Sequence, residues 1–211
     1  MDIVYQDERI VVAIKPAGVI STDVRNGMPE LLRRQLHTDC IRTVHRLDAP
    51  VSGLMVLARS SRAAAEISAQ IRDGAFSKAY LAVLRGVPQE MSGELIDLLG
   101  RDRERRMTYV ADAPGKGVQE ARLRYEVLAV RDDLSLVRVE LLTGRTHQIR
   151  VQFASRGLPL AGDRRYGSPG DLLSPIALWS AHLSFRHPET GAEMTFDRQP
   201  PAIPPWDVFG I

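Results

Sequence analysis

Apolar positions along this chain gather in short runs rich in β-branched residues, each bounded by turn-forming residues. The runs lie at 9–14, 54–58, 78–87, 121–130, 135–142, 179–185 and 193–196. This pattern is typical of strands rather than helices. An Asp-Asp pair at 132–133 and the segment 188–191 separate neighbouring runs, and each predicts a hairpin. The sequence therefore favours a sheet with mainly antiparallel connections.

Helical spacing appears in three shorter segments, which cover 29–36, 62–72 and 146–156. In the second segment, Ile67 and Ile71 stand one helical turn apart and follow Ser60, which predicts an N-cap. In the third, Ile149 and Phe153 form the apolar pair. Because no strand–helix–strand repeat dominates, we predict an α+β fold with a mixed, mainly antiparallel sheet.

Composition narrows the class of protein without identifying it. The chain has 211 residues, of which 44% are hydrophobic and 26% charged, so it can form one domain or two closely joined lobes. A net charge of +2 permits nucleic-acid binding but does not argue for it. With Cys40 as the single cysteine, an intrachain disulfide is excluded. The acidic start of the chain and the lack of a long apolar run predict a cytoplasmic protein without a membrane span.

Several common catalytic signatures are missing from the sequence. It contains no HExxH, no CxxC and no cluster of likely metal ligands, and its five histidines are scattered. It contains no Walker-type phosphate loop, no GxGxxG and no GxSxG. We therefore expect neither a metal nor a nucleotide cofactor.

A candidate catalytic carboxylate is Asp48, on a polar loop directly before the apolar run 54–58. A lone acid on a loop is most often solvated or a cap, so position alone is weak evidence. Here Arg46 precedes it, and the apolar side chains of Leu47 and Leu54 are expected to anchor the loop. An anchored backbone holds a carboxylate in a fixed place, as positioned chemistry requires.

Two further segments allow both a structural and a functional interpretation. Between Arg145 and Arg165 there are five arginines and one acid, which gives this segment a net charge of +4. This pattern fits a solvated helix face and a phosphate-binding patch equally well. Tyr80, on the run 78–87, is most simply a packing residue, but a tyrosine face can also stack on a nucleobase. The charged, glycine-containing segment 100–117 is expected to form an exposed connection or a hairpin, either as an ordinary solvated loop or as a loop near RNA.

Taken together, these segments resemble the RluA-type family of RNA pseudouridine synthases. The resemblance rests on VHRLDAPVSGL at 44–54, KAYLA at 78–82, GRTHQIRV at 144–151, PLAGD at 159–163 and Tyr166-Gly167, in this order. The opening VYQD and KPAG segments, at 4–7 and 15–18, and the closing 178–188 also fit. One short motif can occur by chance, whereas several in the family's order over nearly the whole chain can hardly do so.

The resemblance implies a fold and an activity. The fold is the pseudouridine synthase catalytic fold, a single domain over 1–211 with two closely joined subdomains, flanking helices and a central RNA-binding cleft. The activity is conversion of uridine in rRNA or tRNA to pseudouridine, without cofactor or metal. Many members carry an N-terminal S4-type RNA-binding domain, which is not expected here. The residues from about 199 to 211, with four prolines at 200–205, are expected to form an irregular tail.

The resemblance also implies roles for individual residues. Asp48 would be the essential carboxylate, and Arg150 would pair with it. Tyr80 would stack on the target base and help to remove the C5 proton. Arg46 would enter the RNA stack and help to hold the base out. Further RNA contacts are expected from the basic and polar residues of these motifs, namely His45, Arg145, His147, Gln148, Arg164 and Arg165.

One departure and two alternatives remain at this point. The family usually has threonine where Val51 stands, a position that is expected to support the loop rather than the chemistry. A uridine-specific RNA N-glycosidase would use the same carboxylate but release uracil. A non-catalytic RNA-binding or ribosome-assembly protein would need the basic residues but not Asp48. By resemblance we expect a monomer whose partner is RNA, with no obligate protein partner.

Overall fold

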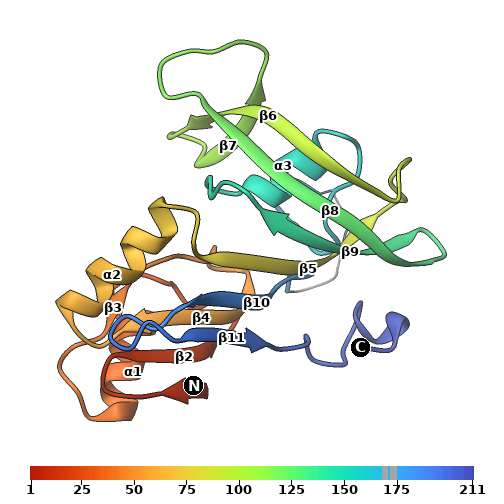
Figure 1. Cartoon of the computed structure of the whole chain (residues 1–211). Coiled ribbons are helices and arrows are strands. Elements are labelled where there is room, and N and C mark those ends of the chain that lie inside the picture. Colours follow the sequence, from red (N-terminus) through yellow and green to blue (C-terminus); the bar gives the residue numbers. More distant parts are fainter. Residues whose placement is uncertain (168–170, 172–174) are drawn as a thin grey trace. The chain divides into compact units, whose positions relative to one another are not determined.

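Two units make up the fold, each built on its own set of strands (Figure 1). The computed structural model describes residues 1–167, 171 and 175–211. The first unit comprises Met1–Lys78 and Trp179–Gln199, and the second comprises Ala79–Leu178 and Pro200–Ile211. The first unit is therefore discontinuous in sequence, because the second is inserted between two of its segments. The expected α+β class, with mainly antiparallel strands, is confirmed.

Strands of the first unit lie in the order β1-β2-β4-β10-β11, and β3 also pairs with β4. Their bounds are β1 (Asp2–Gln6), β2 (Ile10–Lys15), β3 (Arg42–Thr43), β4 (Ser52–Ala58), β10 (Leu178–Arg186) and β11 (Glu193–Asp197). The β4–β10 pair is parallel, with Ser52 opposite Trp179 and Gly53 opposite Ser180. The remaining pairs in this unit are antiparallel. The hairpin predicted around 188–191 is the β10–β11 pair.

Each face of this sheet is covered by a helix. Successive strand residues point to opposite faces, so Leu54 and Val56 pack in one cluster with Ile67 of α2 (Ser61–Arg72). On the other face, Met55 and Leu57 pack with Met28 and Leu32 of α1 (Met28–Leu36). Burial on both faces explains why β4 is apolar at every position from 54 to 58. The predicted cap of α2 is confirmed, because the Ser60 side chain accepts a hydrogen bond from Ala63 N at 3.1 Å.

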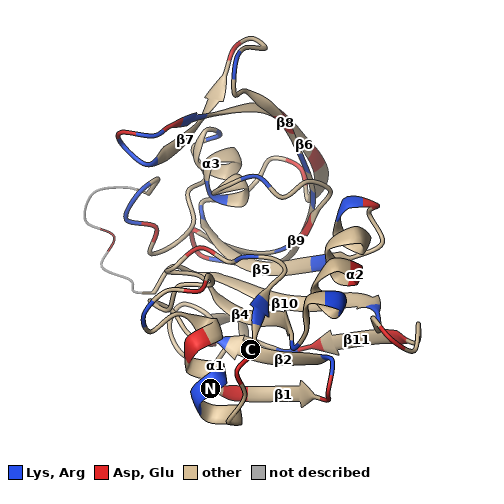
Figure 2. Ribbon diagram, turned by 90° about the vertical axis from the view of Figure 1, so that its left-hand side faces the viewer, with Lys and Arg blue, Asp and Glu red and all other residues tan. Residues whose placement is uncertain are grey.

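Strands of the second unit lie in the order β5-β9-β8-β6-β7 and pair antiparallel throughout. Their bounds are β5 (Ser77–Arg85), β6 (Ser92–Asp102), β7 (Met107–Ala111), β8 (Gln119–Arg131) and β9 (Leu134–Leu141). Figure 2 shows β6, β7, β8 and β9 curving around α3 (Gln148–Ala154). Every residue of α3 from 148 to 153 is buried, including two glutamines and one arginine. Buried polar groups need partners, and those of α3 lead to the candidate site.

Three local expectations were incomplete. The helix predicted over 146–156 begins at Gln148, because His147 adopts the left-handed conformation with φ 55°. Strands β1, β3, β6 and β7 were not predicted individually, although β7 and the end of β6 fall in the segment 100–117, for which a hairpin was one expectation. In the tail, Trp206 is buried and a 3-10 turn covers Asp207–Phe209, so this segment is partly ordered against its unit. Among the described residues, no helix is long and apolar enough to cross a membrane.

Candidate active site

Asp48 lies in the loop between β3 and β4, and the residues on both sides of it are tied down. Leu47 is buried at 6% exposure, and its backbone forms two hydrogen bonds with the buried Ser21 hydroxyl. Ser21 Oγ donates to Leu47 O at 2.7 Å and accepts from Leu47 N at 3.0 Å. A turn closes on the other side, where Val51 N donates to Asp48 O at 3.0 Å. The expectation that Leu47 and Leu54 anchor the loop agrees with their burial.

Lys15, the last residue of β2, is a second anchor of this loop. Its side chain is fully buried, and Nζ donates to Pro16 O at 2.9 Å, Val19 O at 2.6 Å and Ala49 O at 3.0 Å. Burial lowers the pKa of Lys15 to about 8, while the negative charge of Asp48 acts in the opposite direction. The ammonium thus holds the residue directly after Asp48 and places a positive charge near the carboxylate.

Glycines adapt the backbone on both sides of the loop. Gly18 N donates to Ala49 O at 2.7 Å from a left-handed conformation with φ 86°. Gly53 has φ 117°, and a Cβ there would lie 2.4 Å from Ser180 O on the neighbouring strand β10. A side chain at Gly53 would therefore push the two paired strands apart. The SGL part of the motif serves the close approach of β4 and β10 rather than the chemistry.

Arg46 and His45, although adjacent, lie in opposite environments. Arg46 is exposed, and within the described part of the chain it makes no hydrogen bond or ion pair. His45 is buried at 7% exposure, its Nε2 accepts from Val56 N at 3.1 Å, and its ring lies against Phe76. Burial, and secondly the charge of Lys78, lower the pKa of His45 to about 3, so the ring is neutral. These features favour a structural role for His45 over contact with RNA.

Tyr80 and Arg150 belong to the second unit. Tyr80 lies on β5 opposite Val139 of β9 and is buried at 5% exposure. Arg150 lies on α3 and is buried with Asp163 as a two-bond ion pair, with side chains 5% and 0% exposed. Arg150 Nε donates to Asp163 Oδ2 and Nη2 donates to Oδ1, both at 2.7 Å. Burial raises the pKa of Asp163, but the hydrogen bond and charge of Arg150 outweigh it and hold that pKa below its usual value.

Tyr166 completes the surroundings of Arg150. The guanidinium carbon of Arg150 lies 5.1 Å from the centre of the Tyr166 ring. The Tyr166 hydroxyl accepts from Thr108 N at 2.8 Å and lies 2.7 Å from His147 Nδ1. The hydroxyl therefore links a backbone amide of β7 to the His147 imidazole. His147, predicted to contact RNA, is therefore also part of the packing around α3.

Gln148 and Arg145 hold the turn that precedes α3. Gln148 is 3% exposed; its Oε1 accepts from Thr143 Oγ1 at 2.8 Å and from Arg145 N at 3.0 Å. Its Nε2 donates to Arg122 O at 3.0 Å. Arg145 Nε donates to Glu120 O at 2.9 Å. These backbone contacts give both residues a structural task, and their predicted contact with RNA stays a prediction.

Basic residues between 145 and 165 do not form one exposed patch. Arg150 is buried, and Arg156 pairs with Asp97 of β6 at 2.9 Å. Arg164 and Arg165 are exposed and take part in none of these side-chain ion pairs, and their contact with phosphate stays a prediction. Arg165 also donates to Arg106 O, in the turn between β6 and β7. A local charge count from the sequence could not reveal these pairings, because Asp97 is distant along the chain.

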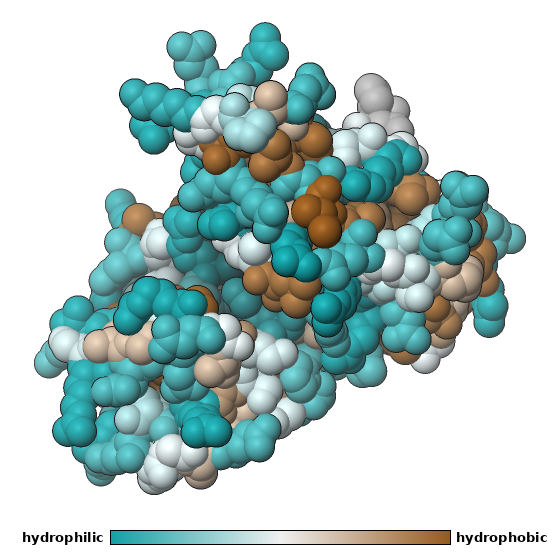
Figure 3. Space-filling view, turned by 45° about the horizontal axis from the view of Figure 1, so that its top comes forward, coloured by the Kyte–Doolittle hydropathy of each residue, from teal (hydrophilic) through white to brown (hydrophobic). Residues whose placement is uncertain are grey.

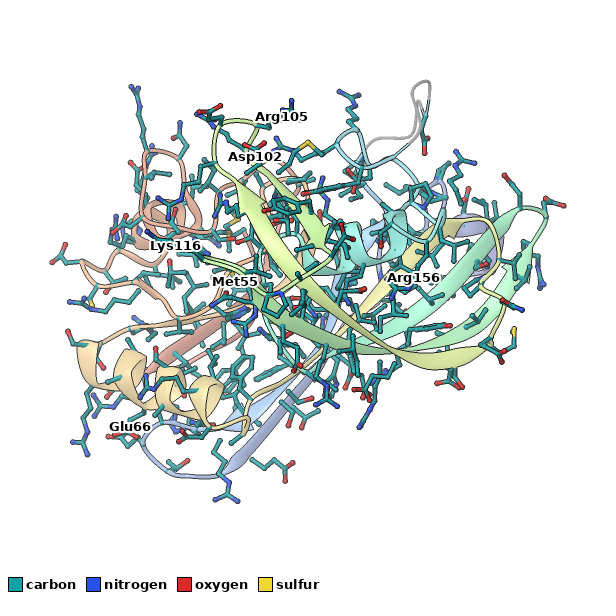
Figure 4. The ribbon with its side chains drawn as sticks, turned by 90° about the horizontal axis from the view of Figure 1, so that it is seen from above. Met55, Glu66, Asp102, Arg105, Lys116 and Arg156 are labelled. Atoms are coloured by element: carbon teal, nitrogen blue, oxygen red, sulfur yellow. The ribbon has the colours of Figure 1, made fainter. Side chains whose placement is uncertain are left out.

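The segment 100–117 forms two separate features rather than one loop. Asp102 and Arg105 lie at the tip of the β6–β7 hairpin, whereas Lys116 lies away from them, between β7 and β8 (Figure 4). The tip carries alternating charges, RDRERR at 101–106, and Arg105 contacts Asp102 at 3.8 Å.

On the face shown in Figure 3, hydrophilic residues prevail and apolar areas are small and separate. No group of three His, Cys, Asp or Glu side chains arranged to hold a metal ion occurs among residues 1–167, 171 and 175–211.

Sequence analysis missed several of these residues. Lys15 and Ser21 were not identified as anchors of the Asp48 loop, although Lys15 stood in a quoted motif. A lysine that ends an apolar strand just before proline was the available signal. Asp163 was counted only as the one acid in a basic segment, and Tyr166 only as part of a motif.

Comparison with known proteins assigns the family. The RNA pseudouridylate synthase family matches residues 9–155. An uncharacterised RNA pseudouridine synthase of Bacillus subtilis, YhcT, is 34% identical over 200 residues, which cover 90% of this chain and 65% of the relative. The ribosomal large subunit pseudouridine synthase D of Zymomonas mobilis is 32% identical over 224 residues, covering 95% of this chain and 69% of the relative. The chain thus spans about two thirds of the length of these curated relatives.

A solved structure agrees with this assignment. The structure titled human RNA pseudouridylate synthase domain containing 1 has a TM-score of 0.83 and 26% sequence identity, over 98% of this chain and 86% of that chain. The structure titled human RNA pseudouridylate synthase domain containing 4, at 22% identity and a TM-score of 0.78, shares the fold. The resemblance inferred from the motifs is confirmed: this chain belongs to the RNA pseudouridylate synthase family, whose members isomerise uridine in RNA to pseudouridine.

Proposed function

We propose that this protein isomerises specific uridines in structured RNA to pseudouridine, with Asp48 as the reacting carboxylate. The observation that carries the proposal is the loop around Asp48. Its neighbours Leu47 and Ala49 are held by Ser21 and Lys15, so the carboxylate has a fixed place while remaining half-buried. Fixed placement of a reacting group is a large part of enzymatic rate enhancement.

The reaction exchanges one bond to the sugar for another. The bond between uracil N1 and ribose C1′ breaks, the base turns, and a bond forms between C5 and C1′. C5 then loses its proton, and N1 ends with one. Asp48 acts either as the nucleophile at C1′ or as a base on the sugar, and both routes need an ionised carboxylate.

The target base must leave the RNA stack before it can react. Unstacking costs a few kcal/mol. In our proposal, Arg46 enters the vacated place in the stack and offsets part of this cost, which its exposure and lack of a partner among the described residues support. We keep the predicted roles of Tyr80, which stacks on the base and serves the C5 proton, and of Arg150, which provides the guanidinium for the reacting carboxylate.

For the substrate we propose rRNA or tRNA. The name of the Zymomonas mobilis relative refers to the ribosomal large subunit, which supports rRNA as the first RNA to test. Arg164 and Arg165 are the exposed basic residues that we propose for the phosphate backbone. We further propose that the protein acts in the cytoplasm as a monomer, without an obligate protein partner.

The test is tritium release from RNA labelled at uridine C5. We expect the wild type to release tritium without free uracil, and Asp48→Asn to bind RNA but release none. Asp39→Asn, which changes an exposed aspartate of the same unit, should behave as wild type. Free uracil would establish an N-glycosidase instead. Tight RNA binding with no release by the wild type, on rRNA and tRNA alike, would favour the non-catalytic alternative and overturn the proposal.

A further inference from the structure

The buried pair Arg150–Asp163 is not what stability alone would retain. Both side chains are almost completely removed from solvent, at 5% and 0% exposure. Removing two charges from water is costly, and well-packed apolar residues often replace such pairs with no loss of stability. The enclosed helix α3 could therefore be packed with an apolar residue at position 150. A fixed direction for the guanidinium is what the ion pair adds.

Asp163 is itself held rigidly. Besides Arg150, its Oδ1 accepts from Arg165 N at 2.9 Å and from Tyr166 N at 3.2 Å. Its carbonyl oxygen accepts from Gly167 N at 2.7 Å. A Cβ at Gly167 would lie 2.3 Å from that oxygen, so the turn that orients Asp163 requires glycine. The carboxylate therefore has contacts that fix it besides its pair with Arg150.

The guanidinium is constrained on one edge and on one face. Asp163 holds the edge formed by Nε and Nη2, which fixes rotation within the guanidinium plane. The Tyr166 ring, 5.1 Å from Cζ, limits tilting of that plane. Tyr166 is held in turn through its hydroxyl, by Thr108 N of β7 and by His147. Two independent contacts therefore specify one orientation.

We propose that Asp163 and Tyr166 are positioning residues that orient Arg150 for the isomerisation. The inference rests on the proposed function, since it assigns Arg150 to the reacting carboxylate. The two residues act through Arg150 and touch neither RNA nor the reacting atoms. Misplacement of a reacting group by about 1 Å can reduce a rate by about 100-fold. Loss of either constraint should therefore lower kcat while RNA affinity stays nearly constant.

Three variants separate positioning from folding. Asp163→Glu keeps the charge but displaces it by one methylene. Tyr166→Leu removes the ring and leaves the ion pair. Tyr166→Phe keeps the ring over Arg150 and loses only the hydroxyl contacts. Asp163→Asn is the most direct change, but it removes the negative charge bonded to a buried guanidinium, so the variant can fail to fold. Asp97→Asn is the matched control, because it removes the carboxylate that pairs with Arg156, an arginine that follows the end of α3.

The experiment measures single-turnover rate and RNA dissociation constant for each folded variant. We expect rates about 10- to 100-fold lower for Asp163→Glu and Tyr166→Leu, a smaller loss for Tyr166→Phe, and dissociation constants within about 3-fold of wild type. Asp97→Asn should retain the wild-type rate. In an Arg150→Gln background, Asp163→Glu should cause no further loss, because the two residues act as one unit.

A second readout does not depend on activity. NMR of the guanidinium groups should show the Arg150 Nε hydrogen protected from exchange in wild type and Asp97→Asn, and exchanging faster in Asp163→Glu. The proposal is overturned if the folded Asp163 and Tyr166 variants keep rates within about 3-fold of wild type, or if their losses follow RNA affinity. A wild type that forms no pseudouridine refutes the proposed function instead, a result seen before any variant is compared.

Discussion

Replacing Lys15 with methionine should destabilise the protein and slow the reaction, because both depend on the loop that carries Asp48. Methionine has a similar length and fills the buried space, so the change removes chiefly the ammonium group. Three carbonyl oxygens, those of Pro16, Val19 and Ala49, then lose the hydrogen bond from the ammonium group. Ala49 O retains the hydrogen bond from Gly18 N. The loop should loosen without collapse of the sheet.

The magnitude follows from opposing contributions. Hydrogen bonds to a charged group contribute about 1.5–3 kcal/mol each, and Lys15 makes three of them. Against this stands the cost of burying an ammonium, of several kcal/mol, which the lowered pKa of Lys15, about 8, reflects. We expect a net loss of about 2–4 kcal/mol in the free energy of unfolding. The reaction rate should fall by about 10-fold or more, since Asp48 is no longer held.

The assay is urea unfolding together with tritium release at a temperature where both proteins are folded. Lys116→Met, at an exposed lysine, is the control and should change the free energy of unfolding by less than about 0.5 kcal/mol. The pH dependence gives a further check. The pKa of Lys15 is lowered from 10.5 to about 8, so the unfolded chain binds the proton more tightly. The stability of wild type relative to Lys15→Met should therefore rise between pH 8 and 10.5.

Two results would refute this reasoning. One is a Lys15→Met protein as stable and as active as wild type, which would mean that the three carbonyl contacts do not hold the loop. The other is a stability difference that falls as pH rises above 8, which would mean that the folded protein favours the charged lysine.

Three further predictions test other parts of the first unit. Gly53→Ala should lower the free energy of unfolding by about 3–5 kcal/mol, since it combines a strained φ with a clash against Ser180 O. The control Gly191→Ala, with φ +71° and open space, should lower it by about 1–2 kcal/mol. Equal losses for the two variants in thermal or urea unfolding would contradict the argument. The pKa of His45 is lowered from 6.5 to about 3, so the contribution of its neutral ring to stability is present above pH 6.5 and lost as pH falls through 3. In urea unfolding, the difference in free energy of unfolding between wild type and His45→Gln should shrink over that range. A difference that stays constant with pH would exclude a buried neutral imidazole. Arg46→Ala should leave stability within about 0.5 kcal/mol but lower kcat/KM for RNA roughly 10- to 100-fold, as loss of one stacking contact implies; unchanged kcat/KM would remove Arg46 from base flipping.

Sequence patterns predicted the strands whose side chains alternate or are wholly apolar, and missed those defined by pairing. The run 54–58 is apolar throughout because both faces of β4 are buried, and it was predicted as a strand. Strand β6 contains exposed Ile96 and Glu94 and reads as an ordinary charged segment, yet it hydrogen-bonds to β7 and β8 along its length. Such pairing is set by backbone partners that are distant in sequence, which a local pattern does not encode.

In the candidate site, too, some residues could be predicted from local sequence and others only from the fold. Asp48 could be selected from its motif and from the apolar residues around it. The anchors Lys15 and Ser21 were missed. The position of Lys15 at the end of an apolar strand was a signal, but its role depends on three carbonyl groups that only the fold brings to it. Likewise, the sequence shows Asp163 as one acid among arginines, whereas its pairing with Arg150 depends on the turn at Gly167.

The discontinuity of the first unit has a consequence for synthesis on the ribosome. Strand β4 pairs with β10, and the whole of Ala79–Leu178 is translated between them. While that segment emerges, the edge of β4 that later meets β10 lacks its partner, and an unpaired edge is a template for wrong pairing. The close approach of Gly53 and Ser180 forms only when residues near 180 have left the exit tunnel. The strand that follows the Asp48 loop is therefore among the last parts of the nascent chain to be completed, and we expect this step to be the one that chaperones protect.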